Sequence, residues 1–287
     1  MDISVFTLVF KNRSIEDTIK IAKEIGYDGI ELWGAEPHIS SDTPINKVKQ
    51  IKELTDKYEL TLPSIGSYIG DFSTLSDDEC KQEVEKLEKF FNIMNILKCD
   101  LIRVNPGGPN AFLAQEYHYE KGLYWMNICA NLAAQYNVRI AMEIHNGSLI
   151  ETVEAASDFL KRLNKENVGI ILDAGNMYIS GTDYGTRAVE ILSEKVFHVH
   201  VKDELRVKDD TLPDTFHDKT IYGDEIFQQK LLGEGAVDHL PLFKALIKSN
   251  YNGFLSSECH VNMPDIEKAK HELAKIRELL NMAKVNI

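Results

Sequence analysis

The sequence predicts an α/β fold, a single (β/α)8 TIM barrel spanning residues 1–287, on the basis of two observations. First, eight short runs rich in apolar or β-branched residues alternate with helix-length amphipathic segments. Second, the turn after the first run, from Phe10 to Ser14, lacks the glycine-rich phosphate motif that is typical of the rival open, doubly wound sheet. The predicted strands are residues 3–10, 28–33, 60–66, 101–106, 139–146, 168–174, 196–202 and 253–259.

Start and stop signals place a helix after each predicted strand. The first helix is predicted to end at Gly26, and the long charged helix after the third strand is predicted to end near Lys98. Helix starts are marked by Ser or Thr caps, by an acid three residues after the cap, or by proline in the first turn. These start signals are Ser14 with Asp17, Thr43 with Pro44, Ser76 with Glu79, Thr182, and Met263 with Pro264.

The interval between the seventh and eighth predicted strands is too long for a minimal connection. We expect the stretch from Asp203 to Asp238 to form an active-site loop. No segment rich in Pro, Gly or Ser divides the chain, so we expect one domain.

Composition disfavours several classes of protein. The chain carries 32 Lys and Arg against 45 Asp and Glu, and this net charge of −13 disfavours nucleic acid and anionic membranes as partners. No apolar run approaches membrane-spanning length, and the first residues show no basic segment followed by a long apolar stretch. We therefore expect a cytoplasmic protein. The 4 Cys residues lie far apart, which predicts reduced thiols instead of a thiolate zinc site or disulfides.

Acidic or imidazole side chains stand at the carboxyl ends of four predicted strands: Glu143, Asp173, His200 and Glu258. In a closed barrel these ends meet at one rim, so the four side chains are predicted to converge as ligands of one divalent cation. Taken singly, each also fits a hydrogen-bonded strand-end acid or a buried histidine. Their shared position on four strands favours the metal site.

The types of these ligands predict a chemistry. Three carboxylates and one imidazole form an anionic, oxygen-rich set that favours Mn²⁺, with Mg²⁺, Co²⁺ and Zn²⁺ as alternatives. A cation chelated by a carbonyl and a neighbouring hydroxyl would stabilise an ene-diolate and ease removal of a carbon-bound proton. One group must take that proton and another must return it. Glu143 and Glu258, from different sides of the barrel, are the predicted catalytic pair.

Six segments together resemble the sugar phosphate isomerase/epimerase superfamily, whose members have a xylose isomerase-like TIM barrel. The resemblance covers nearly the whole chain. It implies that Glu143, Asp173, His200 and Glu258 bind the cation and that the protein is a homo-oligomer. One departure is Asn176, where many members have histidine, and it argues against a multi-metal site. The matching segments are Gly26–Leu32, Glu143–Asn146, Asp173–Asn176, His198–Asp203, Gly233–Gly235 and Ser257–Glu258.

Four further residues are predicted to bind substrate: His145, Asn176, Lys202 and Arg206. The resemblance implies the role of Arg206, which matches an arginine six positions after the metal histidine in ketose epimerases. Each prediction has an alternative. His145 also fits a loop cap, Lys202 fits a salt bridge to Asp203 or another acid, and Arg206 fits a solvated loop residue.

The leading prediction is a divalent-metal-dependent isomerase or epimerase whose partner is a small sugar, sugar phosphate or polyol ketone. An inosose-type dehydratase is the first alternative, because it would begin with the same proton removal and then expel a hydroxyl group. An apurinic endonuclease is disfavoured by Asn176 and by the acidic balance. A non-catalytic sugar-binding barrel is compatible with the fold alone.

Overall fold

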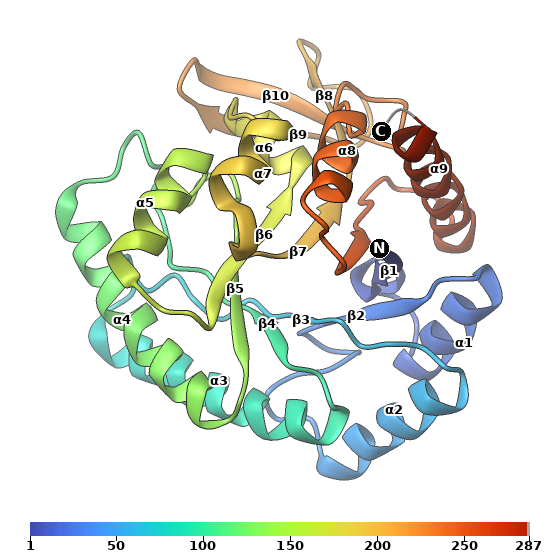
Figure 1. Cartoon of the computed structure of the whole chain (residues 1–287), viewed down its shortest axis with the longest axis horizontal. Coiled ribbons are helices and arrows are strands. Elements are labelled where there is room, and N and C mark those ends of the chain that lie inside the picture. The colour runs from blue at the N-terminus through green and yellow to red at the C-terminus, as the bar shows by residue number, and fades with distance from the viewer. Residues whose placement is uncertain (286–287) are drawn as a thin grey trace.

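The computed structural model describes residues 1–285 and contains a closed barrel of eight parallel strands (Figure 1). The order of neighbours around the barrel is β1-β11-β7-β6-β5-β4-β3-β2, which confirms the predicted TIM barrel. The barrel strands are β1 (Asp2–Phe6), β2 (Gly29–Trp33), β3 (Ile65–Gly66), β4 (Leu101–Arg103), β5 (Arg139–Glu143), β6 (Val168–Asp173), β7 (Val196–Val201) and β11 (Phe254–Ser257).

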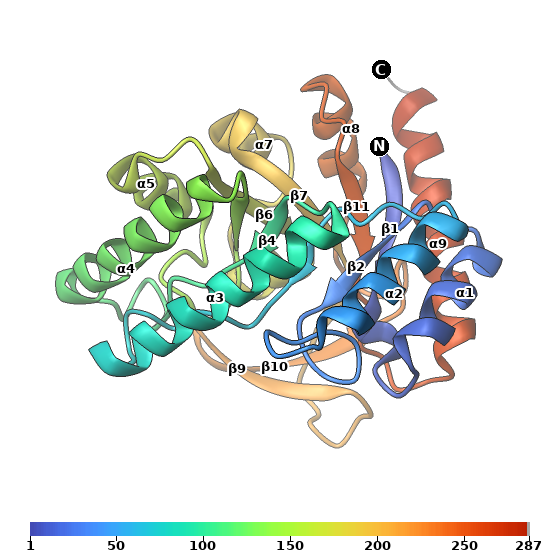
Figure 2. The ribbon, with the colours of Figure 1, turned by 90° about the horizontal axis from the view of Figure 1, so that it is seen from below.

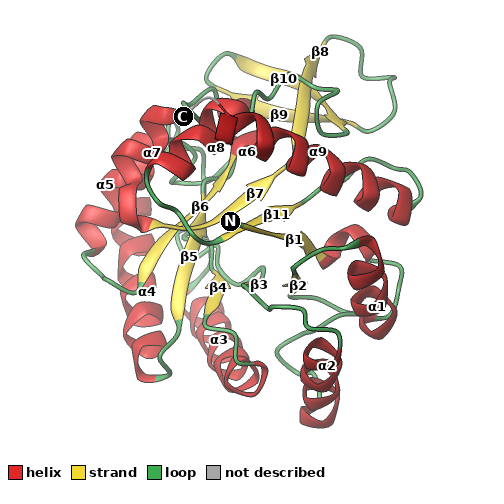
Figure 3. Ribbon diagram, turned by 45° about the vertical axis from the view of Figure 1, so that its right-hand side comes forward, coloured by secondary structure: helices red, strands yellow, loops and turns green. Residues whose placement is uncertain are grey.

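Helices form the outer layer around these strands (Figure 3). Each helix presents an apolar stripe to the barrel, as Ile15, Ile19 and Ala22 of α1 show, because residues three or four apart share one face. The helices are α1 (Ile15–Ile25), α2 (Ile45–Lys57), α3 (Asp77–Leu97), α4 (Glu116–Gln135), α5 (Val153–Leu163), α6 (Ala174–Ser180), α7 (Thr186–Leu192), α8 (Leu240–Lys248) and α9 (Asp265–Val285).

The helix ends follow the predicted caps in most places. Ser14 Oγ accepts from the Asp17 backbone N–H (3.1 Å), and Gly26 ends α1 with a φ of 103°, a left-handed conformation that favours glycine. The prediction for α2 was wrong by one residue. Thr43 Oγ1 accepts from the backbone N–H of Ser40 (2.7 Å) instead, so Thr43 stabilises the preceding turn and the helix begins after Pro44.

The barrel strands are shorter than predicted, and the first and third show the cause. The first run leaves the sheet after Phe6, because residues 7–10 form a 3₁₀ turn that directs Val9 and Phe10 into the core. The third run pairs as a strand only at β3, apart from an isolated bridge between Gly29 and Thr61. Pro63 stands between that bridge and β3, and its missing N–H cannot join the hydrogen-bond ladder.

The stretch from Asp203 to Asp238 was expected to be a loop, and this prediction was wrong. It contains a three-stranded antiparallel sheet of β8 (Asp203–Val207), β9 (Thr215–Thr220) and β10 (Gly223–Lys230). Figure 2 shows β9 and β10 lying across one end of the barrel. Ile221 and Tyr222 form a tight turn between β9 and β10, and β8 pairs with the other edge of β10, so the sheet satisfies many of its own backbone groups.

None of the helices in residues 1–285 is long and apolar enough to cross a membrane. Within the same range, the Cys side chains are buried free thiols, as expected from their spacing.

Glu272 of α9 is a buried carboxyl group far from solvent. Its Oε1 accepts from the Leu232 backbone N–H (3.0 Å), and its Oε2 forms no hydrogen bond with any described residue. Burial raises the pKa of Glu272 to about 7, from an ordinary value of 4.5. The folded chain therefore holds this proton longer than the unfolded chain. The free energy of unfolding therefore contains a contribution of up to ~3 kcal/mol that is fully present below about pH 4.5. This contribution is lost as the pH rises through about 7.

Glu272→Gln should remove this pH dependence, because the amide keeps an acceptor for Leu232 and cannot ionise. We expect the variant to gain more free energy of unfolding over the wild type at pH 8 than at pH 5, measured by urea titration. Glu278→Gln, at an exposed position of the same helix, is the control. If Glu272→Gln and the wild type showed the same pH dependence, the assigned proton linkage would be wrong.

Candidate metal centre

The carboxyl ends of β5, β6, β7 and β11 meet at one rim of the barrel. Glu143 and Asp173 are the last residues of β5 and β6, and Asp173 lies beside His200 of β7 in the strand register. Glu258 follows β11 directly, and its backbone N–H donates to the Val201 carbonyl of β7 (3.0 Å). Because parallel barrel strands all end on one side, these positions become neighbours although they are far apart in the sequence.

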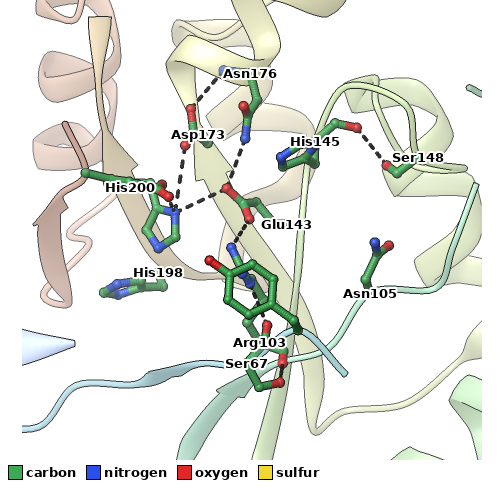
Figure 4. Close-up of polar contacts among 12 residues, drawn as sticks. Ser67, Arg103, Asn105, Glu143, His145, Ser148, Asp173, Asn176, His198 and His200 are labelled. Atoms are coloured by element: carbon green, nitrogen blue, oxygen red, sulfur yellow. Dashed lines mark hydrogen bonds and ion pairs between the residues drawn. The ribbon is translucent and has the colours of Figure 1, made fainter. Parts of the chain in front are cut away.

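The side chains of the four predicted ligands converge. His200 Nδ1 lies 2.9 Å from Glu258 Oε2, 3.2 Å from Glu143 Oε1 and 3.8 Å from Asp173 Oδ2. One candidate ligand atom from each residue lies within 4.8 Å of all the others. Figure 4 shows Glu143, Asp173 and His200 directed towards one another.

This donor set fits a divalent cation. The four side chains are buried, so the negative charge of three carboxylates accumulates away from water. Asp173 Oδ2 and Glu258 Oε2 have no hydrogen bond of regular geometry among the described residues, although His200 Nδ1 and Lys202 Nζ lie within 4.0 Å of both. Burial raises the pKa of Asp173 to about 6; Lys202 opposes this rise, and Glu143 and Glu258 add to it. A bound divalent cation would add to the positive charge that Lys202 places beside these oxygens.

The sequence prediction missed Glu31 of β2, a fully buried carboxylate at this site. Its Oε2 lies 3.0 Å from His200 Nε2 and 3.1 Å from His198 Nε2. Burial would lower the pKa of His200, but Glu31, Glu258 and Glu143 outweigh it and raise that pKa in the absence of a cation. With a cation bound, a neutral His200 that donates its Nε2–H to Glu31 would present an unprotonated Nδ1 to the cation, which is the tautomer that a metal ligand needs. The signal in the sequence was an acid inside the apolar run of residues 28–33.

The sequence prediction also missed Arg103, the last residue of β4. Its Nη1 donates to Glu143 Oε2 (2.6 Å) and its Nε donates to the Ser67 carbonyl (3.0 Å) (Figure 4). Its guanidinium lies 4.8 Å from the Tyr68 ring centre. Burial by itself would raise the pKa of Glu143, but Arg103 and His200 outweigh it and hold that pKa below its ordinary value. The signal in the sequence was a single charged residue inside the predicted strand 101–106.

A cavity of about 450 Å³ is lined by Glu143 and Glu258, and we call it the rim cavity. Two of the predicted substrate residues, His145 and Lys202, also line it. Lys202 is buried, and its Nζ lies 3.3 Å from Asp173 Oδ2. The rim cavity therefore combines three carboxylates, an ammonium, a guanidinium and two imidazoles around one space.

The other two predicted substrate residues, Asn176 and Arg206, do not line the rim cavity. Asn176 Nδ2 donates to Glu143 Oε1 (3.0 Å), and its backbone N–H donates to Asp173 Oδ1 (2.8 Å), so Asn176 holds two of the candidate ligands. Arg206 of β8 lines a separate cavity, where its guanidinium lies 5.9 Å from the Tyr222 ring centre. Its role in substrate binding stays a prediction.

The fold and the buried group of carboxylates and imidazole define a TIM barrel with a candidate metal centre at its carboxyl-terminal rim. The chain belongs to the xylose isomerase-like TIM barrel family, whose model matches residues 19–279. The resemblance that the sequence motifs indicated is therefore confirmed.

Relatives of the chain include dehydratases and epimerases. A 3-dehydroshikimate dehydratase from Bacillus anthracis is 26% identical over 205 residues, covering 70% of this chain and 71% of that protein. An inosose dehydratase from Lactiplantibacillus plantarum is 28% identical over 158 residues, covering 52% of this chain and 50% of that protein. A fructoselysine 3-epimerase from Escherichia coli O157:H7 is 22% identical over 299 residues, covering 98% of each chain.

The solved structures agree with this fold. A probable 3-DHS dehydratase from Bacillus anthracis superposes with a TM-score of 0.80 at 22% identity, covering 96% of this chain and 99% of that chain. The comparisons therefore establish the family and the fold, and they place the chain near enzymes of two reaction types.

Proposed function

We propose that this protein is a manganese-dependent isomerase or epimerase that removes and returns a proton beside the carbonyl of a small sugar, sugar phosphate or polyol ketone. The observation that carries this proposal is the placement of Glu143 and Glu258 in one candidate metal group and along one cavity. Two carboxylates that contact the same substrate allow one to take a proton and the other to return it.

The surroundings of both carboxylates suit this role. Burial would raise the pKa of Glu258, but Lys202 and His200 outweigh it and hold the pKa well below its ordinary value, as Arg103 does for Glu143. Both groups are therefore ionised at neutral pH and able to accept a proton. Lys202 can donate a hydrogen bond from its ammonium group to a substrate oxygen in the rim cavity. When bound, a divalent cation would polarise the substrate carbonyl and stabilise the charge that develops on its oxygen.

A dehydratase is the second candidate, and the dehydratases among the relatives favour it. It would share the proton removal and would also need a proton donor for the departing hydroxyl group. His145 and His260 line the rim cavity and are available for that task.

The test is to incubate the manganese-loaded protein in deuterated water with ketoses, sugar phosphates and inososes, and to analyse products by NMR and mass spectrometry. Deuterium on carbon without loss of water supports an isomerase or epimerase, whereas loss of water supports the dehydratase. Failure to exchange any carbon-bound proton, with the metal bound, would overturn the proposal in favour of a binding protein. Cleavage of an abasic duplex would instead favour an endonuclease.

A further inference from the structure

A second cavity, of about 550 Å³, adjoins the rim cavity, and we call it the side cavity. The loop after β1 and the segment between β11 and α9 form most of its lining. His260 lines both cavities, and its Nε2 lies 3.2 Å from Glu258 Oε1. The side cavity is therefore one imidazole away from a proposed catalytic carboxylate.

The main feature of the side cavity is the ammonium group of Lys268, in the first turns of α9. Lys268 is only 7% exposed, and its Nζ donates to the Val261 carbonyl (3.0 Å). It forms no ion pair with a carboxylate of residues 1–285. Burial lowers the pKa of Lys268 and the nearby ammonium group of Lys11 lowers it further, whereas Cys259, Asp265 and Glu272 oppose this without forming an ion pair with Lys268.

The lining carries three cationic side chains, Lys11, Arg13 and Lys268, against the two carboxylates of Asp214 and Asp265. Arg13 and Asp265 neutralise each other through two hydrogen bonds, of 2.6 and 2.7 Å. Asp214 accepts from the Asn262 backbone N–H (3.1 Å), and Lys11 is exposed at the mouth. The amino-terminal end of α9, a helix of 21 residues, adds a positive partial charge on the same side.

A buried ammonium with a single carbonyl partner is unfavourable unless an anion accompanies it. Acidic side chains outnumber basic ones in this chain, whose net charge is −13, yet Lys268 has no carboxylate as a direct partner. A ligand with a negative charge would explain this arrangement. A volume of about 550 Å³ accommodates a phosphate or carboxylate together with neighbouring carbon atoms.

We propose that the side cavity binds the anionic group, a phosphate or a carboxylate, of the same substrate whose carbonyl end lies in the rim cavity. This inference rests on the proposed function and narrows the substrate class to sugars and polyol ketones that carry a phosphate or a carboxylate. Lys268 provides the charge at the base of the site and Lys11 the charge at its mouth.

The test is calorimetric titration of the full-length, metal-loaded protein with inorganic phosphate and, separately, with acetate. We expect the wild type to bind one of these anions, and we expect Lys268→Met to weaken that binding at least tenfold. Lys270→Met, at an exposed position of the same helix, is the matched control and should bind like the wild type. Preference for phosphate or for acetate distinguishes the two sources of the anionic group.

Lys11→Met keeps the test informative if the buried substitution impairs folding, because Lys11 is exposed. We expect Lys11→Met to weaken anion binding about threefold or more. Equal binding by the wild type and both variants, or no binding of either anion, would overturn the inference. The titration does not depend on turnover, so it separates the two proposals. If the protein binds neither anion but still exchanges a carbon-bound proton of neutral sugars, only this inference is rejected. If the protein exchanges no carbon-bound proton, the proposed function is rejected.

Discussion

Glu143→Gln and Glu258→Gln should each lower the rate of proton exchange by about 10³-fold or more, because each removes one of the two groups proposed to transfer the proton. Gln keeps the size of the side chain and an acceptor oxygen, so Arg103 retains a partner at position 143. The measurement is the rate of deuterium incorporation into the substrate that the wild type turns over, at saturating manganese.

Metal content and far-UV circular dichroism separate loss of chemistry from loss of the cation or of the fold. Asn105→Asp is a useful control, because Asn105 lines the rim cavity and lies outside the group of candidate ligands. It should alter KM more than the rate at saturation. Retained exchange in both glutamine variants would show that other groups move the proton.

Glu31→Gln should weaken manganese binding by about 10- to 100-fold, a typical effect of losing a carboxylate that orients a metal-binding histidine. Glu31 Oε2 is the shared partner of His198 and His200. An amide offers a donor as well as an acceptor, so it no longer requires His200 to carry its proton on Nε2. The measurement is equilibrium titration of the metal-free protein with Mn²⁺, followed by electron paramagnetic resonance.

Glu204→Gln is the matched control for this second prediction. Glu204 is also buried, and burial raises the pKa of its carboxyl to about 8, so it is mostly protonated at neutral pH and an amide resembles it closely. We expect its manganese affinity to equal that of the wild type. If Glu31→Gln and Glu204→Gln bound manganese equally well, Glu31 would have no role in positioning His200.

Local patterns in the sequence predicted the alternation of strands and helices and most helix starts. Ser14 and Ser76 form caps because a hydroxyl at the end of a helix satisfies a nearby backbone N–H, and this needs only residues three positions away. The rule that parallel barrel strands end on one side then brought Glu143, Asp173, His200 and Glu258 to a common rim. Their role as ligands stays a prediction that the geometry supports.

Other features depended on partners far away in the chain. Glu31 and Arg103 belong to the site because the register of β2 and β4 places them against His200 and Glu143. Within its own run, each looks like an isolated charge in a strand. The position of Arg206 also depends on a distant partner. The antiparallel pairing of β8 with β10 places Arg206 beside a cavity lined by Tyr178 and Tyr222.

The sequence by itself therefore determined the order of elements, the barrel and the four side chains at its rim, because periodicity, caps and strand ends depend on neighbouring residues. Only the tertiary structure decided which buried charges support those side chains, how the segment from Asp203 to Asp238 folds, and where a second cavity adjoins the first. Those outcomes depend on strand register and on contacts between distant segments, and neither is encoded in any short stretch of the chain.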